Sequence, residues 1–474
     1  MTRSSRSIRA ALVALAMMGA AHLAAAQSAD AQLQQGVGSD VPAPAAPAPG
    51  GAPPEPPLPP GASVPLAAPS PPAAPPAAEP IPPAPPVVAP LVVAPPVAAP
   101  PAPVPPSVAS PATASWDNVE RVVTMGDLHG DYPKFVAMAQ SAGLIDNRGD
   151  WIGGRTHFVQ LGDIPDRGDE TRKILDHLMR LEPQAKAAGG HIHALIGNHE
   201  AMNITGDLRY VSPGEYRAFV DLASARKRDA YFREVVRAIR EGRGPGKSRV
   251  VDDAFRDEWE RKHPLGFVEH RQAWATDGQY GRWIASHDAV IRINDTLYMH
   301  AGIGPAFPDA PREVINEAVR AALQSRPVPA FADILDHPEG PLWYRGFAIN
   351  AETVESAHLA SLLARHGVSR VVVGHTKRAA MVLPRFGGRV ILTDIAVPAG
   401  YSDPHAFLVQ ENGALHAVHR GRRVPLDFSP TADPCGYFSA VAALDPPNAP
   451  TKRIVANCGA PGPANVAPAS GTGQ

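Results

Sequence analysis

Short apolar runs recur along this chain, and each ends in a glycine-containing polar motif. The five clearest runs are Val122–Met125, Phe158–Leu161, Ala194–Ile196, Leu297–Met299 and Val371–Val373. Short, mainly apolar runs bounded in this way are typical of buried β-strands. Between the first three runs, the pattern predicts helices over residues 133–142 and 169–188. Strands that alternate with helices predict βαβ units and therefore an α/β fold.

Residues 205–286 interrupt this alternation with a charged stretch that contains scattered aromatic residues. Its periodicity predicts a helical cap beside the strands, with helices over residues 215–220, 229–240 and 254–262. The apolar run Val290–Ile293 then precedes an Asn-Asp turn and a further strand, which predicts a hairpin. A helix over residues 351–366 and more strands over 381–409 complete the expected domain.

The ends of the chain differ in composition from this middle part. Residues 1–26 combine three arginines, a short apolar run and an Ala-rich end, which predicts a cleaved signal peptide; the alternative is an N-terminal membrane anchor. Residues 27–115 are rich in Pro and Ala, cannot bury a core, and are expected to be disordered or extended. The folded domain is expected over residues 116–429, followed by a loosely structured tail over 430–474.

The net charge and the cysteine content limit the classes of protein to which this chain can belong. The formal net charge of the 474 residues is −2, and no strongly basic face is evident, which argues against a nucleic-acid partner. The only two cysteines are Cys435 and Cys458. In an exported protein they are candidates for a disulfide, and the alternative is two free thiols in a loose tail.

The polar motifs at the strand ends carry the candidate chemistry. They are Gly126–Gly130, Gly162–Gly168, Gly197–Glu200, His300–Gly302 and Gly374–Thr376. Carboxylates, imidazoles and one carboxamide on such loops can converge and hold two divalent metals, which clamp a phosphate and activate water. Nitrogen and oxygen ligands without thiolate favour Mn, Fe or Zn over Ca. A single such Asp or His is usually structural, whereas five motifs in one order indicate a site.

Individual roles can be proposed from residue type and spacing. Asp127 and His129 lie on one tight turn, so both can reach one ion. Asp163 has two carboxylate oxygens and can bridge two ions. The second ion can be completed by three further residues, Asn198, His300 and His375.

The remaining candidates handle phosphate and protons. Arg167 offers a planar guanidinium for phosphate oxygens. Asp166 can orient His199, which can then protonate a leaving oxygen. Arg345 is a candidate second phosphate clamp, or else a surface arginine beside a packed Trp. Glu200 is expected to orient His199 or a metal ligand.

These motifs resemble the phosphoprotein phosphatase family of calcineurin-like metallophosphoesterases, closest to the Shewanella-like protein phosphatases. The resemblance covers residues 119–409 and includes Gly206–Tyr210, Gly281–Ile284 and Trp343–Gly346. It implies a calcineurin-like β-sandwich flanked by helices. It also implies metal ligands at Asp127, His129, Asp163, Asn198, His300 and His375. The implied phosphate contacts are Arg167, Asn198, His199 and Arg345, with Asp166 supporting His199.

The resemblance also sets the expected function. The chain departs from the family at Ala301, where Gly is usual, and it lacks a recognisable C-terminal substrate loop of the eukaryotic protein phosphatases. The expected activity is a dinuclear-metal-dependent phosphatase for phosphomonoesters. Its substrate is expected to be a phosphorylated protein, with a preference for phosphotyrosine, or else a small phosphomonoester. The alternatives are a dinucleoside polyphosphate hydrolase, or an envelope interaction protein tethered by its Pro-rich segment. The expected location is the periplasm, where the Pro-rich segment serves as a spacer on an envelope surface or as an inert linker.

Overall fold

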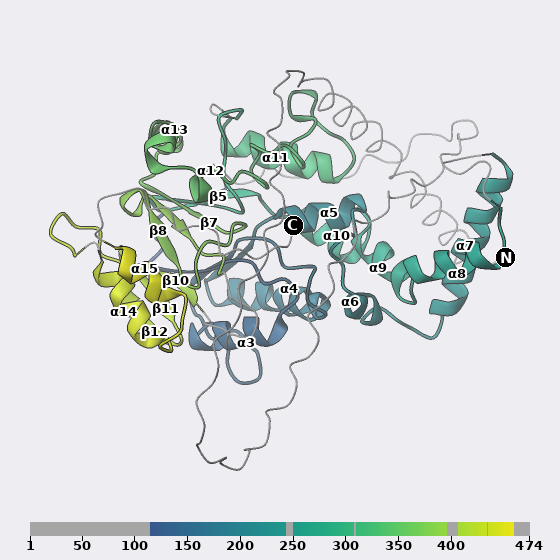
Figure 1. The fold of residues 1–474 in the computed structure, drawn as a ribbon, viewed down its shortest axis with the longest axis horizontal. Coiled ribbons are helices and arrows are strands. Elements are labelled where there is room, and N and C mark those ends of the chain that lie inside the picture. The colour runs from purple at the N-terminus through teal and green to yellow at the C-terminus, as the bar shows by residue number, and fades with distance from the viewer. Residues whose placement is uncertain (1–113, 243–249, 308–309, 396–405, 434, 459–474) are drawn as a thin grey trace, which may run out of the picture. The chain divides into compact units, whose positions relative to one another are not determined.

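Two mixed β-sheets of six strands each form the centre of the protein in this computed structural model (Figure 1). The structure describes residues 114–242, 250–307, 310–395, 406–433 and 435–458. The expected signal peptide and nearly all of the Pro-rich segment lie outside the described residues. Within the described ranges, no helix combines the length and apolar character that crossing a membrane requires.

The first sheet contains the three parallel strands expected from the N-terminal half. Its strands, in spatial order, are β12 Arg422–Pro425, β11 Ala414–His419, β10 Ala406–Glu411, β2 Arg121–Met125, β3 His157–Gln160 and β4 His191–Ala194. The crossovers are helices α3 Tyr132–Ser141 and α4 Thr171–Ala187. Helix α3 begins where the Asp131 side chain accepts the Lys134 N–H at 3.0 Å, which is an ordinary N-cap.

The second sheet contains the expected hairpin and its parallel partners. Its strands, in spatial order, are β1 Ser115–Trp116, β5 Val290–Ile293, β6 Thr296–Met299, β7 Arg370–Val373, β9 Val390–Leu392 and β8 Leu383–Arg385. Helices α11 Arg312–Leu323, α12 Gly346–Ile349 and α13 Glu352–His366 accompany it. Helix α13 ends at Gly367, whose φ of 62° is the left-handed C-cap conformation that glycine adopts readily.

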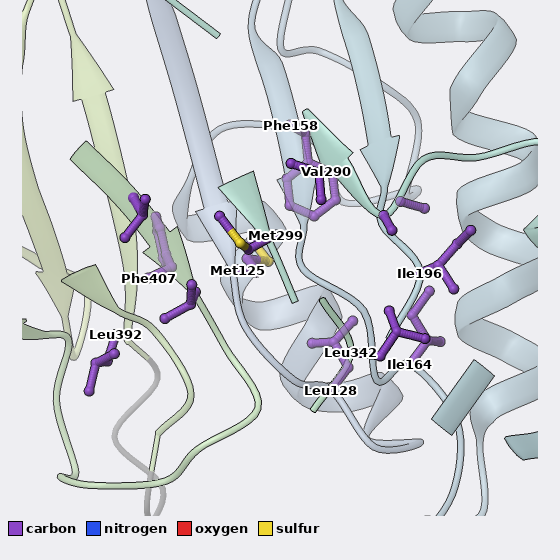
Figure 2. Close-up of a cluster of buried hydrophobic side chains, with 14 of the residues drawn as sticks. Met125, Leu128, Phe158, Ile164, Ile196, Val290, Met299, Leu342, Leu392 and Phe407 are labelled. Atoms are coloured by element: carbon purple, nitrogen blue, oxygen red, sulfur yellow. The ribbon is translucent and has the colours of Figure 1, made fainter. Parts of the chain in front are cut away.

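Apolar residues lie both between the sheets and beneath the helices. Along β2, Val122 belongs to the cluster between the sheets, and Val123 belongs to the cluster on the opposite face. This alternation follows from the two-residue period of a strand. Figure 2 shows residues of the cluster that contains Val123, among them Met125 of the first sheet and Met299 of the second. Figure 1 places α3 and α4 on one side of the strands and α11 and α13 on the other.

The interruption at residues 205–286 is helical, as expected. Helix α5 Asn198–Thr205 leads into α6 Pro213–Arg217, α7 Ser224–Arg240, α8 Asp253–Lys262, α9 Phe267–Trp274 and α10 Gln279–Ile284. The buried Arg271 of α9 donates to the carbonyl oxygens of Asn203 and Ile204 on α5. This contact attaches the cap to the helix that begins with Asn198.

Two expected boundaries need correction. Ala114 and Ser115 were expected in the linker, but the Arg292 N–H donates to the Ala114 carbonyl at 2.9 Å and Ser115 pairs with Arg292 in register. The fold therefore begins by Ala114. The C-terminal segment was expected to be loose, but it contains α14 Gly436–Leu444 and α15 Thr451–Asn457.

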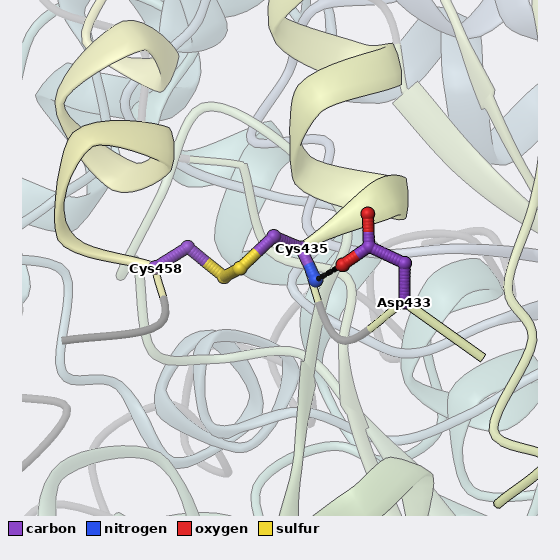
Figure 3. Close-up of a disulfide and its surroundings, with 3 residues drawn as sticks. All are labelled: Asp433, Cys435 and Cys458. Atoms are coloured by element: carbon purple, nitrogen blue, oxygen red, sulfur yellow. Dashed lines mark hydrogen bonds between the residues drawn. A yellow bond between two sulfur atoms is a disulfide. The ribbon is translucent and has the colours of Figure 1, made fainter. Parts of the chain in front are cut away.

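The C-terminal helices are held by a covalent bond and by packing. A disulfide joins Cys435 to Cys458 (Figure 3), which resolves the alternative of two free thiols. The Tyr437 hydroxyl donates to the Val382 carbonyl at 2.6 Å, and Val441 is fully buried. These contacts attach α14 to the segment that precedes β8, while α14 also packs beside β12 of the first sheet.

Candidate active site

The expected metal ligands lie just beyond the C-terminal ends of strands in both sheets. Asp127 follows β2, Asp163 follows β3, and Asn198 begins α5 after the loop that leaves β4. In the second sheet, His300 follows β6 and His375 follows β7. All five side chains are buried. The two sheets therefore contribute together to one site.

His300 lies at the centre of one ligand group. Its Nε2 is 2.9 Å from Asn198 Oδ1, 3.0 Å from His375 Nδ1 and 3.3 Å from Asp163 Oδ1. Its Nδ1 donates to the Leu161 carbonyl at 2.8 Å, which leaves a lone pair on Nε2. The four nitrogen and oxygen atoms that these distances join therefore lie close together, and most of them are hydrogen-bond acceptors. A divalent cation satisfies them all, so the residues fit a metal.

His129 belongs to a second group around the other Asp163 oxygen. Its Nε2 is 3.7 Å from Asp127 Oδ2 and 3.8 Å from Asp163 Oδ2. Its Nδ1 donates to the Pro165 carbonyl at 3.1 Å, so Nε2 again presents its lone pair. Because Asp163 contributes one oxygen to each group, it is placed to bridge two ions.

The pKa values of the imidazoles separate ligands from proton carriers. Burial lowers the pKa of both His129 and His375 well below the usual range, so both are neutral, as metal ligands must be. Burial also opposes charge on His199, but the carboxylates of Asp163 and Asp166 outweigh it and raise the pKa of His199 to about 9. These two carboxylates therefore favour the protonated form of the His199 imidazole.

His199 and Asp166 form a buried dyad. Asp166 Oδ2 is 2.5 Å from His199 Nδ1, and the Asn203 amide donates to Asp166 Oδ1 at 2.9 Å. His199 Nε2 is 3.7 Å from Asp163 Oδ2, so geometry alone would also allow it to join His129 and Asp163 around an ion. The carboxylate partner and the raised pKa favour a proton donor instead.

The two arginines expected at phosphate lie at the surface of the site. Arg167 lies over the ring of Tyr210, with its guanidinium carbon 5.5 Å from the ring centroid. Arg345 donates to Thr376 Oγ1 at 3.1 Å, beside the metal ligand His375. Both arginine side chains are exposed.

Glu200 supports a metal ligand and does not contact His199. Its two carboxylate oxygens accept three backbone N–H groups, from Asp163 at 2.9 Å, Ile164 at 2.8 Å and Gly197 at 2.8 Å. Of the two roles expected for Glu200, orientation of a ligand is therefore the one that its contacts support.

Asp394 is a buried carboxylate of the site that the sequence argument missed. Burial and repulsion from Asp127 raise the pKa of Asp394 well above its usual range. Its Oδ2 has no hydrogen-bond partner among the described residues. The signal was present, because Asp394 follows the apolar run Val390–Leu392 just as the ligands follow their strands.

The backbone of the site adopts a conformation that is rare outside glycine. The non-glycine site residues with φ between 47° and 75° are His129, Asp163, Asp166, Arg167 and His375. Such residues cost of order 1–3 kcal/mol each and persist only where the surrounding structure holds them, commonly at functional sites. Gly162 is required at its position, because its φ is 93° and an added Cβ would lie 2.6 Å from the Gly197 nitrogen.

Comparisons with known proteins agree with this geometry. Residues 120–379 match the family model described as calcineurin-like phosphoesterase. The chain is 31% identical over 318 residues to Shewanella-like protein phosphatase 2 of Arabidopsis thaliana, which spans 64% of this chain and 78% of that protein. It is 22% identical over 317 residues to Shewanella-like protein phosphatase 1 of Plasmodium berghei, spanning 64% and 76%. Among solved structures, a cold-active protein-tyrosine phosphatase of a psychrophilic Shewanella species has 28% identity and a TM-score of 0.50, covering 66% of this chain and 82% of that one.

Proposed function

Since this chain belongs to the calcineurin-like phosphoesterase family, we propose that it is a dinuclear-metal-dependent phosphatase that acts on phosphorylated proteins and favours phosphotyrosine. The family and the phosphatase relatives make it a phosphoric monoester hydrolase. The observation that carries the finer proposal is the buried Asp166–His199 dyad beside two groups of metal-type ligands that share Asp163.

The residues divide into two ligand sets. Asp127, His129 and Asp163 would hold one ion. The other ion would be held by Asp163 together with three further residues, Asn198, His300 and His375. Bound divalent ions of this kind act as Lewis acids toward phosphate and lower the pKa of water. Mn, Fe and Zn all suit these nitrogen and oxygen ligands.

The side chains around these ions perform the remaining steps. Arg167 and Arg345 orient the phosphate through planar guanidinium groups, which match its oxygens. His199 Nε2 gives its proton to the leaving oxygen as the P–O bond breaks, and Asp166 holds the imidazole in the required tautomer. Asn203 fixes Asp166 through its amide and so positions the acid indirectly.

The preference for phosphotyrosine is supported by leaving-group chemistry and by similarity. A phenolic oxygen has a pKa near 10 and leaves more readily than a serine alkoxide. The similar Shewanella protein is itself named a protein-tyrosine phosphatase. The exposed Arg345 and the partly exposed Trp343 both line a cavity of about 250 Å³, in which we propose that the aromatic ring lies.

A matched substrate series tests the proposal. We expect kcat/KM for a phosphotyrosine peptide to exceed that for a phosphoserine peptide of the same sequence, and both to exceed that for diadenosine tetraphosphate. A preference for phosphoserine would overturn only the specificity. A preference for the dinucleotide would overturn the assignment to protein phosphomonoesters.

We also propose that the protein is exported to the periplasm. The support is the pattern of residues 1–26, which matches a cleaved signal peptide ending before Gln27. The intact mass of the protein recovered from the envelope should correspond to a chain that starts near Gln27. An uncleaved N-terminus would indicate a membrane anchor instead.

A further inference from the structure

Three histidines share one face of the first sheet at its edge, outside the site described above. His157 on β3 is paired in register with His191 on β4, and His193 lies two residues further along β4. Because side chains alternate along a strand, residues two apart lie on the same face. The edge position of β4 places this group at the rim of the sheet.

The rings of this group lie in direct contact. His193 Nε2 is 3.0 Å from His157 Nδ1, and the His191 and His193 rings stack with their centroids 4.2 Å apart. The Trp116 ring packs edge-on against His193 at 4.3 Å. Two ring nitrogens 3.0 Å apart are close enough to ligate one ion, since metal–nitrogen bonds to histidine are about 2.0–2.1 Å long.

A cavity of about 450 Å³ lies beside these rings, and a fourth imidazole faces it. Its lining includes His191, His193 and His287. His287 Nε2 is 2.9 Å from Glu182 Oε1, while its Nδ1 is buried and has no partner among the described residues. The cavity therefore contains room for a ligand and a buried nitrogen that nothing satisfies.

The electrostatics of the cluster keep its imidazoles neutral. Burial, followed by repulsion from His191, lowers the pKa of both His157 and His287 to about 4. Burial and the neighbouring histidines lower the pKa of His193 well below its usual range. Neutral imidazoles present lone pairs near pH 7, which is the form that binds metal.

We propose that His157, His191 and His193 form a second metal site, separate from the catalytic centre, for a transition cation that favours imidazole. Zn²⁺, Ni²⁺ and Cu²⁺ are the cations of that class. His157 and His193 supply the two nitrogens that already lie 3.0 Å apart. As the rings lie, the three histidines do not bring their nitrogens within 4.8 Å of one another, so binding requires the His191 ring to rotate.

Equilibrium dialysis of the full chain against Ni²⁺ tests this site. The variant His191→Gln, His193→Gln should hold one equivalent less Ni²⁺ than the wild type, with unchanged phosphatase activity as the control for folding. The variant His416→Gln changes a histidine on β11 of the same sheet and should match the wild type. Equal Ni²⁺ binding by all three proteins would overturn the proposal.

A second measurement uses the unaltered protein, in case the double variant does not fold. Diethyl pyrocarbonate modifies accessible neutral imidazoles, and His191 is partly exposed. Bound Ni²⁺ should reduce modification of His191 severalfold and leave His416 unchanged. Equal modification of His191 with and without Ni²⁺ would contradict the site.

Discussion

At the scale of single residues, the histidines of the active site divide by what their second ring nitrogen contacts. His129 and His300 donate through Nδ1 to backbone carbonyls, so that Nε2 faces the carboxylates. His199 instead contacts the carboxylate of Asp166, which stabilises the charged imidazolium. In the proposed function, this one hydrogen bond distinguishes the histidine ligands from the histidine acid.

This division predicts the effect of removing the acid. His199→Ala should lower kcat for a phosphotyrosine peptide by about 10²–10⁴-fold, the usual contribution of general acid catalysis. Metal content should stay at the wild-type level, because His199 ligates neither ion in this assignment. Both quantities can be measured on the same sample by steady-state kinetics and elemental analysis.

A leaving-group series provides the control for that experiment. Nitrophenyl phosphate has a good leaving group and needs little protonation, so His199→Ala should affect it less than the peptide. An equal loss on both substrates would exclude the acid role. Loss of one bound ion would indicate that His199 is a ligand.

The buried carboxyl group of Glu215 should make the free energy of unfolding depend on pH. It is fully buried, the Thr171 hydroxyl donates to it at 3.1 Å, and burial followed by repulsion from Asp166 raises its pKa to about 8. The unfolded value is about 4.3, so between about pH 4 and 8 the folded state binds more protons. Stability therefore falls as pH rises through this window and levels off above it.

Glu215→Gln should remove this dependence, because a glutamine does not titrate and can still accept from Thr171. Between pH 6 and pH 8 the variant should gain on the order of 2 kcal/mol of unfolding free energy relative to wild type. Urea unfolding at the two pH values measures this difference. The exposed Glu317→Gln serves as control and should show no such gain, and an equal response of both variants would refute the assignment.

The positions of the candidate ligands at strand ends could be predicted from the sequence, whereas some of their supports could not. Asp127 and Asp163 each follow an apolar run, and a strand end is a local signal. Glu215 lies in the cap, and its contact with Thr171 forms only when the cap folds back onto α4. The two carboxylate oxygens of Glu200 accept hydrogen bonds from three backbone N–H groups. No pattern of residues in the sequence predicts this role.

At the scale of elements, the strands that lead to ligands were predictable and the peripheral elements were not. The hairpin of β5 and β6 and helix α13 lie close to their expected ranges. Helix α11 and strands β11 and β12 were missed, and β12 is a short strand in which only Val424 is buried. Pairing with β10 and β11, and not local propensity, makes them strands.

We predict that the disulfide between the C-terminal helices contributes to stability but not to catalytic activity. Replacing both Cys435 and Cys458 by Ser removes a cross-link that closes a loop of 23 positions, which should cost about 3 kcal/mol in the chain-entropy model. Thermal unfolding should shift downward, and kcat/KM should not change, because no active-site residue lies in α14 or α15. A reductant should lower the Tm of the wild type and leave that of the variant unchanged. A comparable decrease in the variant would show that the reductant acts on something other than this disulfide.

At the scale of the whole molecule, the active site joins the two sheets. Asp127, Asp163 and Asn198 come from loops of the first sheet, and His300 and His375 come from loops of the second. The buried carboxylates there repel one another, and burial with repulsion from Asp163 raises the pKa of Asp127 to about 7. Bound cations would offset this repulsion and would also join ligands from the two sheets.

Metal removal should therefore lower both activity and stability. Protein treated with a chelator should lose activity and regain it when Mn²⁺ is added. Mn²⁺ should also raise the Tm. At a free Mn²⁺ concentration about 100 times Kd, the gain in unfolding free energy should be about 2.7 kcal/mol. Differential scanning calorimetry and nitrophenyl phosphate assays measure the two effects. Asp163→Asn should show neither response, and full activity in a verified metal-free sample would refute the metal requirement.

Because the ligands are divided between the two sheets, the ion that is bound depends on where the chain completes its folding. His300 lies 102 positions after Asn198, so at about 5–20 residues per second their synthesis is separated by about 5–20 s. During that interval the ligand set around His300 is incomplete, so its ion is not yet held by every ligand. The ion that is kept is the one available where the second sheet closes onto the first. Two copies of this sequence that finish folding in solutions with different available ions are therefore expected to carry different metals in that set.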